Sequence, residues 1–185
     1  MLLKYSYKTP ENLIPKACLL ARHNHVRSIL KNSLVLDLGC NNYKIINNAV
    51  SFDLDRSVKP DVLGTALNLP FPDESFDTVI TLELVEHFNR KEQTVFLKEI
   101  YKVLKNKGQF IVSTPDIKNK AFKKIHDFLW FISHFIYARK DLGQHVNELT
   151  NDQLFSMLND SKFQIVKGTH FLIFNFVVEC VKVES

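Results

Sequence analysis

The chain has 185 residues, of which 45% are hydrophobic and 24% charged. These values predict one soluble globular domain over residues 1–185, and they exclude disorder, collagen-like repeats and a multi-span membrane protein. The net charge of +4 permits an anionic partner without requiring one. The composition is unusual in two respects, because the chain holds only 5 Gly and as many as 15 Phe.

The predicted elements alternate between helices and strands. The apolar periodicity predicts a helix over residues 11–30, strands at 34–36, 49–52, 61–66 and 76–82, a helix over 91–104 stopped by Gly108, a strand at 110–113, a helix over 152–158 with Thr150 as its N-cap, and strands at 163–166 and 174–183. This alternation is typical of an α/β domain built around a mostly parallel sheet.

The cysteines and the N-terminal segment indicate a cytoplasmic protein. Cys18, Cys40 and Cys180 lie far apart and form no Cys-x-x-Cys pair, which argues against a disulfide framework or a zinc site. Reduced thiols in the cytoplasm are the simplest interpretation. The first residues, MLLKYSYKTPEN, turn polar too soon for a signal peptide. His23 and His25 lack a third ligand in the pattern, so no metal site is predicted.

Polar turns follow the predicted strands. Residues 37–42 (DLGCNN) follow the first strand, Asp53 the second and Glu83 the fourth. Ligands of open α/β sheets bind at the carboxyl ends of the strands, and an acid at the second strand end can accept both hydroxyls of a ribose. The pattern therefore predicts a nucleoside-type cofactor.

Four segments resemble, in order, the motifs of a known family. VLDLGCNN, SFDLD, ALNLPFPDESFDTVITLELVEHF and LKEIYKVLKNKGQFIVSTP, followed by HVNELT at residues 145–150, are similar to those of class I S-adenosylmethionine-dependent methyltransferases of the small-molecule, type 11-like group. The resemblance implies a Rossmann-like sheet with an antiparallel last strand and S-adenosylmethionine as cofactor.

The resemblance also implies roles for individual residues. Asp37 and Gly39 would lie near the methionine part of the cofactor, Asp53 would bind the ribose, and Leu54 would pack on the adenine. The implied cofactor-binding set is Asp37, Gly39, Cys40, Asn41, Asp53, Leu54, Thr65, Ala66, Leu67, Leu82 and Glu83.

The chain departs from the family pattern at three positions. Gly39 is the one glycine kept of the usual three, and Asn41 and Tyr43 stand at the other two. Asn tolerates positive φ well, so Asn41 can hold the turn, whereas the bulky Tyr43 does not share this tolerance. Thr65 replaces an acid that usually contacts the adenine amino group. These departures leave weak cofactor binding open.

The connections in the N-terminal half are short. Residues 40–48 separate the first two strands and residues 54–60 the next two, whereas a crossover usually needs about a dozen residues. The helices there are therefore expected to be cut to a turn or two.

Two histidines are candidates for catalysis. His87 could act as a general base or orient the acceptor, since histidine titrates near neutral pH, or it could simply pack under the cofactor site. His145 precedes the last core helix and is a second candidate, with a plain loop residue as the alternative. Glu86 is expected to be a surface or structural residue, and Asp55 a solvated or capping one.

Residues 116–148 are expected to form a lid-like helical insertion. Residues 128–138 are apolar nearly all round, but eleven residues fall short of the roughly 18 that span a bilayer. Four of the 15 Phe lie here, at Phe122, Phe128, Phe131 and Phe135. A lid over an apolar acceptor pocket is favoured, with peripheral membrane contact through 119–140 or burial against the domain or a dimer partner as alternatives.

The sequence thus predicts an enzyme that transfers a methyl group from S-adenosylmethionine to a small, apolar or aromatic acceptor. The alternatives are a binding or partner-activating subunit that has lost catalysis and, third, an RNA methyltransferase. No NPPY-like tetrapeptide follows the fourth strand and no Pro-Cys nucleophile follows the fifth. DNA is therefore not expected as a partner.

Overall fold

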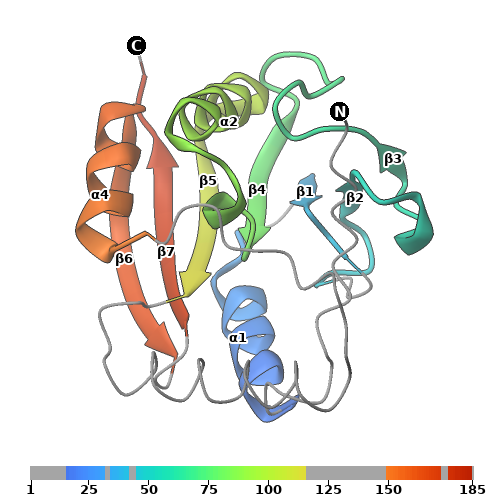
Figure 1. Ribbon diagram of the computed structural model, residues 1–185, viewed down its shortest axis with the longest axis horizontal. Coiled ribbons are helices and arrows are strands. Elements are labelled where there is room, and N and C mark those ends of the chain that lie inside the picture. Colours follow the sequence, from blue (N-terminus) through green and yellow to red (C-terminus); the bar gives the residue numbers. More distant parts are fainter. Residues whose placement is uncertain (1–15, 32–33, 42–44, 116–148, 172–174, 185) are drawn as a thin grey trace.

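A computed structural model describes residues 16–31, 34–41, 45–115, 149–171 and 175–184. They form a seven-stranded sheet of order β3-β2-β1-β4-β5-β7-β6 (Figure 1). The strands are β1 (Val35–Leu38), β2 (Val50–Asp53), β3 (Val62–Leu63), β4 (Phe76–Leu82), β5 (Leu104–Pro115), β6 (Phe163–Phe171) and β7 (Asn175–Lys182). Strands β1 to β5 pair in parallel, whereas β7 runs antiparallel to both β5 and β6. The predicted Rossmann-like α/β fold with an antiparallel last strand is confirmed.

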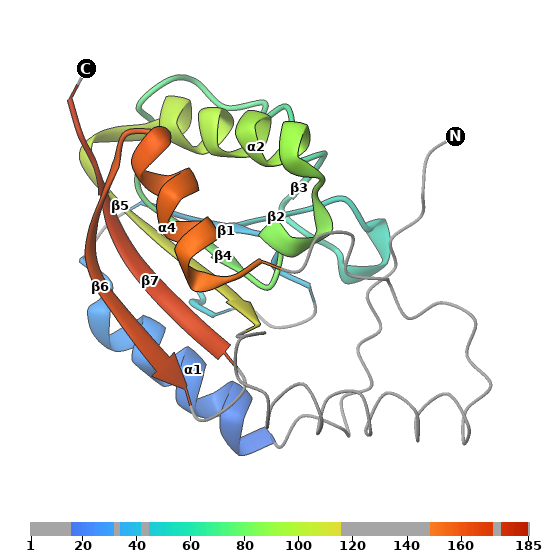
Figure 2. The ribbon, with the colours of Figure 1, turned by 60° about the vertical axis from the view of Figure 1, so that its left-hand side comes forward.

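Helices cover both faces of this sheet. Helix α1 (Lys16–Ile29) lies on one face, and α2 (Arg90–Val103) and α4 (Asn151–Asp160) lie on the other (Figure 2). Two short 3-10 helices, η1 (Arg56–Val58) and η2 (Val85–His87), follow the carboxyl ends of β2 and β4. No helix in the described part of the chain is long and apolar enough to cross a membrane.

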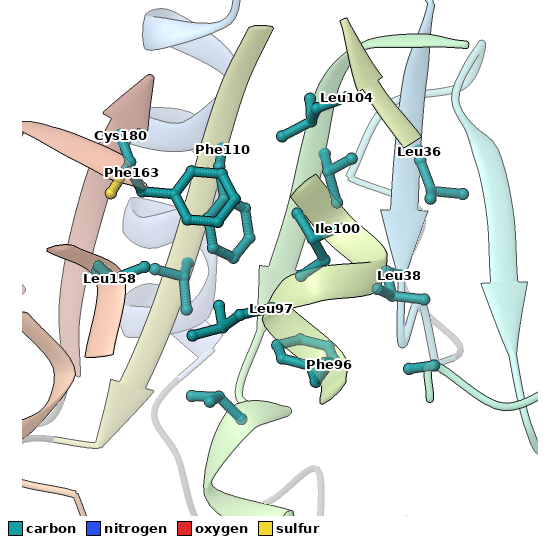
Figure 3. Close-up of a cluster of buried hydrophobic side chains, with 14 of the residues drawn as sticks. Leu36, Leu38, Phe96, Leu97, Ile100, Leu104, Phe110, Leu158, Phe163 and Cys180 are labelled. Carbon is teal, nitrogen blue, oxygen red and sulfur yellow. The ribbon is translucent and has the colours of Figure 1, made fainter. Parts of the chain in front are cut away.

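The larger hydrophobic core lies between the sheet and the helices α2 and α4. Phe110 and Phe163 pack with their ring centroids 5.0 Å apart, beside Leu97 and Ile100 of α2 (Figure 3). A smaller cluster beneath α1 contains Val26, Ile80, Ile111 and Val177. Successive strand residues point to opposite faces, so each central strand contributes to both cores.

Both helices on the larger core begin with a capping box. The side chain of Asn89 accepts hydrogen bonds at the start of α2 and Glu92 reaches back to the Asn89 backbone N–H. Thr150 and Gln153 do the same for α4, so the predicted N-cap at Thr150 is confirmed. These side chains satisfy N–H groups that a helix start leaves without partners.

The structure corrects several predicted boundaries. The helix predicted over 91–104 already ends at Val103, and Gly108 lies inside β5 instead of ending the helix. Strands β5 and β6 are longer than predicted because β7 pairs along both of them. Strand β3 has only two residues. The predicted lid at 116–148 lies outside the described residues.

Short connections in the N-terminal half leave room for little helix. Only η1 lies between β2 and β3, and Asp55 caps it by accepting a hydrogen bond from Ser57 N at 2.8 Å. The capping role predicted for Asp55 is confirmed. The predicted shortening of the helices holds for this connection.

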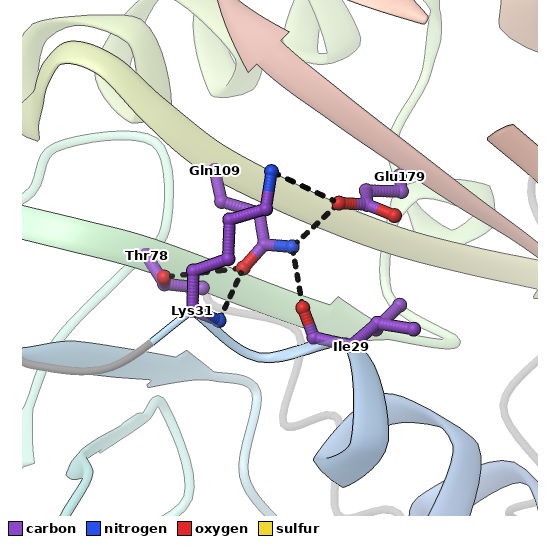
Figure 4. Close-up of polar contacts among 5 residues, drawn as sticks. All are labelled: Ile29, Lys31, Thr78, Gln109 and Glu179. Carbon is purple, nitrogen blue, oxygen red and sulfur yellow. Dashed lines mark hydrogen bonds and ion pairs between the residues drawn. The ribbon is translucent and has the colours of Figure 1, made fainter. Parts of the chain in front are cut away.

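Gln109 of β5 ties the end of α1 to the sheet (Figure 4). Its Nε2 donates to Ile29 O and to Glu179 Oε1, both at 2.8 Å, and its Oε1 accepts from Lys31 N at 3.2 Å. Gln109 is only 3% exposed. A single buried amide therefore fixes where α1 ends relative to β5 and β7.

We expect Gln109→Leu to lower the free energy of unfolding by about 2–4 kcal/mol, because it removes the buried hydrogen bonds to Ile29 O, Lys31 N and the Glu179 carboxylate. Urea denaturation measures this loss. Gln164→Leu, on the exposed side of β6, is the control and should change stability by less than about 0.5 kcal/mol. Equal stabilities of the two variants would contradict this role of Gln109.

Candidate cofactor site

A tight turn follows β1 at the carboxyl edge of the sheet. Gly39 has φ +77° and Asn41 has φ +46°, so both lie in the left-handed region. Gly39 N and Cys40 N both donate to Phe52 O, at 2.8 and 3.3 Å. A Cβ on Gly39 would lie 3.1 Å from Leu84 Cδ2. The turn thus needs glycine at position 39, while Asn41 adopts the conformation expected from its tolerance of positive φ.

Asp53 ends β2 beside this turn, and two backbone N–H groups orient its carboxylate. Oδ2 accepts from Asn41 N at 3.0 Å and Oδ1 accepts from Asp55 N at 2.9 Å. The side chain is half-buried. Each carboxylate oxygen has a second lone pair, so Asp53 can still accept hydrogen bonds from a pair of ligand hydroxyls.

Asp37 and Cys40 form the buried floor of the site. Asp37 Oδ2 accepts from Ile45 N at 3.4 Å, which ties the connection after β1 to the strand. Burial, followed by the negative charges of Asp37 and Asp53, raises the pKa of the Cys40 thiol to about 12. Cys40 is therefore a neutral, buried side chain, and the site around it is electronegative.

The residues predicted to line the adenine lie on the β3 side of the site. Leu54 is 51% exposed, which is unusual for a large apolar side chain directly after a buried strand. Thr65 is exposed, Ala66 is buried and Leu67 is partly buried against the core. Leu67 N donates to Thr65 Oγ1 at 3.3 Å, so Thr65 closes a local turn here.

At the end of β4, Glu83 links three elements. Its Oε1 lies 3.1 Å from Arg22 Nη1 of α1 and accepts from Ser113 Oγ of β5 at 2.8 Å. Glu83 has φ +55°, and its N donates to Ser113 O at 3.1 Å. Leu82 packs toward the α1 cluster. We call Arg22, Glu83 and Ser113 the β4–β5 clamp.

Of the two predicted catalytic histidines, the structure describes one. His87 is half-buried in η2, and its backbone N–H donates a hydrogen bond to Leu84 O at 3.1 Å. His145 lies outside the described residues. Glu86 is only 1% exposed, so the expectation of a surface position for it is wrong, while a structural role stays open.

Sequence patterns did not find Arg22 and Ser113. Arg22 lies among mainly polar residues of α1 and had no motif to mark it, although it is 6% exposed. Ser113 is the last residue of the strand predicted at 110–113, a position that carries no functional signal. Among the described residues, no group of three metal-ligating side chains comes together, and His23 and His25 are no exception.

Comparison with known proteins identifies chains that are similar to this one. Residues 28–112 match the family model described as a methyltransferase domain. An uncharacterised protein of Methanocaldococcus jannaschii is 27% identical over 172 residues, 86% of this chain and 63% of its own length. Probable tRNA methyltransferase 9B of Mus musculus is 32% identical over 108 residues, 50% of this chain and 24% of its own. The match thus spans less than two thirds of the length of each of these two curated relatives.

The fold is also similar to that of a solved methyltransferase. The structure of the Burkholderia thailandensis 1,6-didemethyltoxoflavin-N1-methyltransferase, with 1,6-didemethyltoxoflavin and S-adenosylhomocysteine bound, matches with a TM-score of 0.63. The two chains are 14% identical, and the match covers 91% of this chain and 78% of the other. At this identity the likeness concerns the fold.

Residues 28–112 match the methyltransferase-domain family model, and the described residues have the Rossmann-like fold of solved S-adenosylmethionine-dependent methyltransferases. S-adenosylmethionine is the cofactor of these enzymes. The residues present fit it, because a carboxylate oriented by two N–H groups stands at the end of β2, directly beside the turn after β1.

We expect Gly39→Ala to destabilise the protein by about 1–2 kcal/mol, because L residues pay this cost in the left-handed region and because the added Cβ would press on Leu84. Asn41→Gly is the matched variant, since it relieves positive φ, and should change stability by less than about 1 kcal/mol. Thermal unfolding of both measures the difference. An unaffected Gly39→Ala protein would show that this turn relaxes freely.

Proposed function

We propose that this chain transfers a methyl group from S-adenosylmethionine to a small acceptor, apolar or aromatic in character. Asp53 is the observation that carries the proposal, because its carboxylate is held by Asn41 N and Asp55 N at the strand end where a ribose would bind. The wider methyltransferase assignment rests on the family match and the fold.

When bound, S-adenosylmethionine supplies an electrophilic methyl group on a sulfonium. The chain's own residues would bind the cofactor and orient it toward the acceptor. Asp53 would accept the ribose hydroxyls, the turn at Gly39 would lie beside the methionine part, and the exposed Leu54 would cover one face of the adenine. Alignment of acceptor and methyl group can supply much of the rate by itself.

His87 would orient the acceptor or take its proton. It lies half-buried in η2, directly after the β4 end where the methionine part is expected. His145 and an apolar pocket formed by residues 116–148 remain part of this proposal, and so does membrane contact through 119–140. The apolar character of that segment is the reason to expect an apolar acceptor.

RNA is the second candidate acceptor. Its support is the likeness to Probable tRNA methyltransferase 9B over half of this chain, together with the net charge of +4. Phosphate contacts would give RNA binding a steep salt dependence. Binding that is absent at low salt would remove this candidate.

Asp53→Ala should weaken S-adenosylhomocysteine binding by about tenfold or more, because hydrogen bonds to a charged acceptor contribute about 1.5–3 kcal/mol. Calorimetric titration of wild type and variant measures the ratio. Asp160→Ala is the control, since Asp160 is exposed at the far end of α4, and its affinity should equal that of wild type.

Three results would each contradict the assignment at a different level. Wild-type protein that binds no S-adenosylhomocysteine at millimolar concentration would contradict the cofactor site itself. Tight binding that Asp53→Ala leaves unchanged would contradict the role of Asp53 alone. Tight binding without transfer to any of a set of small aromatic and apolar acceptors would favour the alternative of a binding subunit.

A further inference from the structure

A buried carboxyl group, Glu86, lies next to the β4–β5 clamp. Glu86 follows β4 in η2 and is only 1% exposed. In the described part of the chain neither of its oxygens makes a well-formed hydrogen bond, although its own backbone N–H and the Thr114 hydroxyl lie close enough to interact with it. An ionised carboxylate in such a place would pay a large desolvation cost, whereas the protonated acid pays far less.

The charges that act on Glu86 favour the protonated acid. Burial and then the negative charge of Glu83 raise the pKa of Glu86 well above its ordinary value, and its own backbone N–H, the charge of Arg22 and the Thr114 hydroxyl oppose them more weakly. The other groups near it are the polar side chains of the surrounding elements. Gln93 of α2 donates to Val85 O, Thr81 and Thr114 project to the α2 side of β4 and β5, and His87 is the next residue in η2.

Arg22 is the cation near both Glu83 and Glu86, and it forms its ion pair with Glu83. The Arg22 guanidinium lies 3.1 Å from Glu83 Oε1 through Nη1, while its Nε is buried without a partner. A negative charge on Glu86 would therefore attract the Arg22 guanidinium, whose Nε donor is not in use. It would also repel Glu83.

The position of Glu83 matters for the predicted cofactor site. Glu83 sits at positive φ, and Leu84 beside it packs on Gly39, where a Cβ would lie 3.1 Å from Leu84 Cδ2. A shift of the 83–84 turn would thus change the space at the turn after β1. Leu84 therefore connects the β4–β5 clamp to the turn at Gly39.

We propose that Glu86 is a positioning residue that stays uncharged so that Arg22 remains with Glu83, which keeps Leu84 against Gly39 and the cofactor turn in shape. The effect on cofactor binding rests on the proposed function. The effect on folding does not.

The first test is the pH dependence of stability in wild type and Glu86→Gln. Between the ordinary carboxyl value of 4.5 and the folded-state pKa, the folded chain binds one proton more than the unfolded chain at Glu86. Stability is therefore highest at the acid end of this window and is lost as the pH rises. The folding constant of wild type should fall tenfold more per pH unit than that of Glu86→Gln.

Urea denaturation between pH 5.5 and 8 measures both slopes. Glu184→Gln is the matched control, because Glu184 is exposed and follows the end of β7 that pairs with the start of β5, away from the clamp. It should keep the wild-type slope. If Glu86→Gln does not fold, Glu86→Met replaces it, since an uncharged side chain of similar size should serve. Equal slopes in wild type and the Glu86 variant overturn the proposal.

The second test uses S-adenosylhomocysteine as the probe. Glu86→Gln should bind it as tightly as wild type at pH 6, and the ratio of wild-type to variant Kd should rise with pH, toward tenfold per pH unit once Glu86 ionises. A ratio that stays constant to pH 9, or a variant that binds weakly at pH 6, overturns the proposal. Failure of wild type to bind at any pH would instead contradict the proposed function, and the stability test would still decide the role of Glu86 in folding.

Discussion

The turn after β1 is the constraint on which the rest of the site depends. The backbone must reverse within three residues while Gly39 N and Cys40 N both reach Phe52 O on the neighbouring strand. Positive φ at Gly39 and Asn41 makes this reversal feasible. Asn41 N then meets Asp53, so the same turn that closes β1 also fixes the carboxylate at the end of β2.

Because the connections in this half are short, side chains replace helices as supports. Asp37 holds Ile45 N after β1, and Asp61 accepts from both Ser51 N and Ser51 Oγ beside β3. The large core between the sheet and α2 and α4 supports both halves, since it includes Leu38 and Phe52 as well as Leu97 and Phe110. The predicted cofactor site lies where these side-chain hydrogen bonds meet the edge of that core.

The order of elements and the strand-end acids could be predicted because they depend on local patterns. Alternating apolar runs gave β1, β2 and β4, and the ends of those runs gave Asp37, Asp53 and Glu83. The extent of β5 and β6 could not be predicted, since it depends on pairing with β7 far along the chain. Burial of Glu86 and the partnership of Arg22 with Glu83 depend on packing between α1, β4 and β5, which no local pattern encodes.

The most direct measurement is a crystal structure of this chain with S-adenosylhomocysteine. The account predicts both ribose hydroxyls within hydrogen-bond distance of the Asp53 carboxylate, with Asn41 N and Asp55 N still donating to it. A ligand bound elsewhere on the sheet, or one whose ribose does not contact Asp53, would contradict the account.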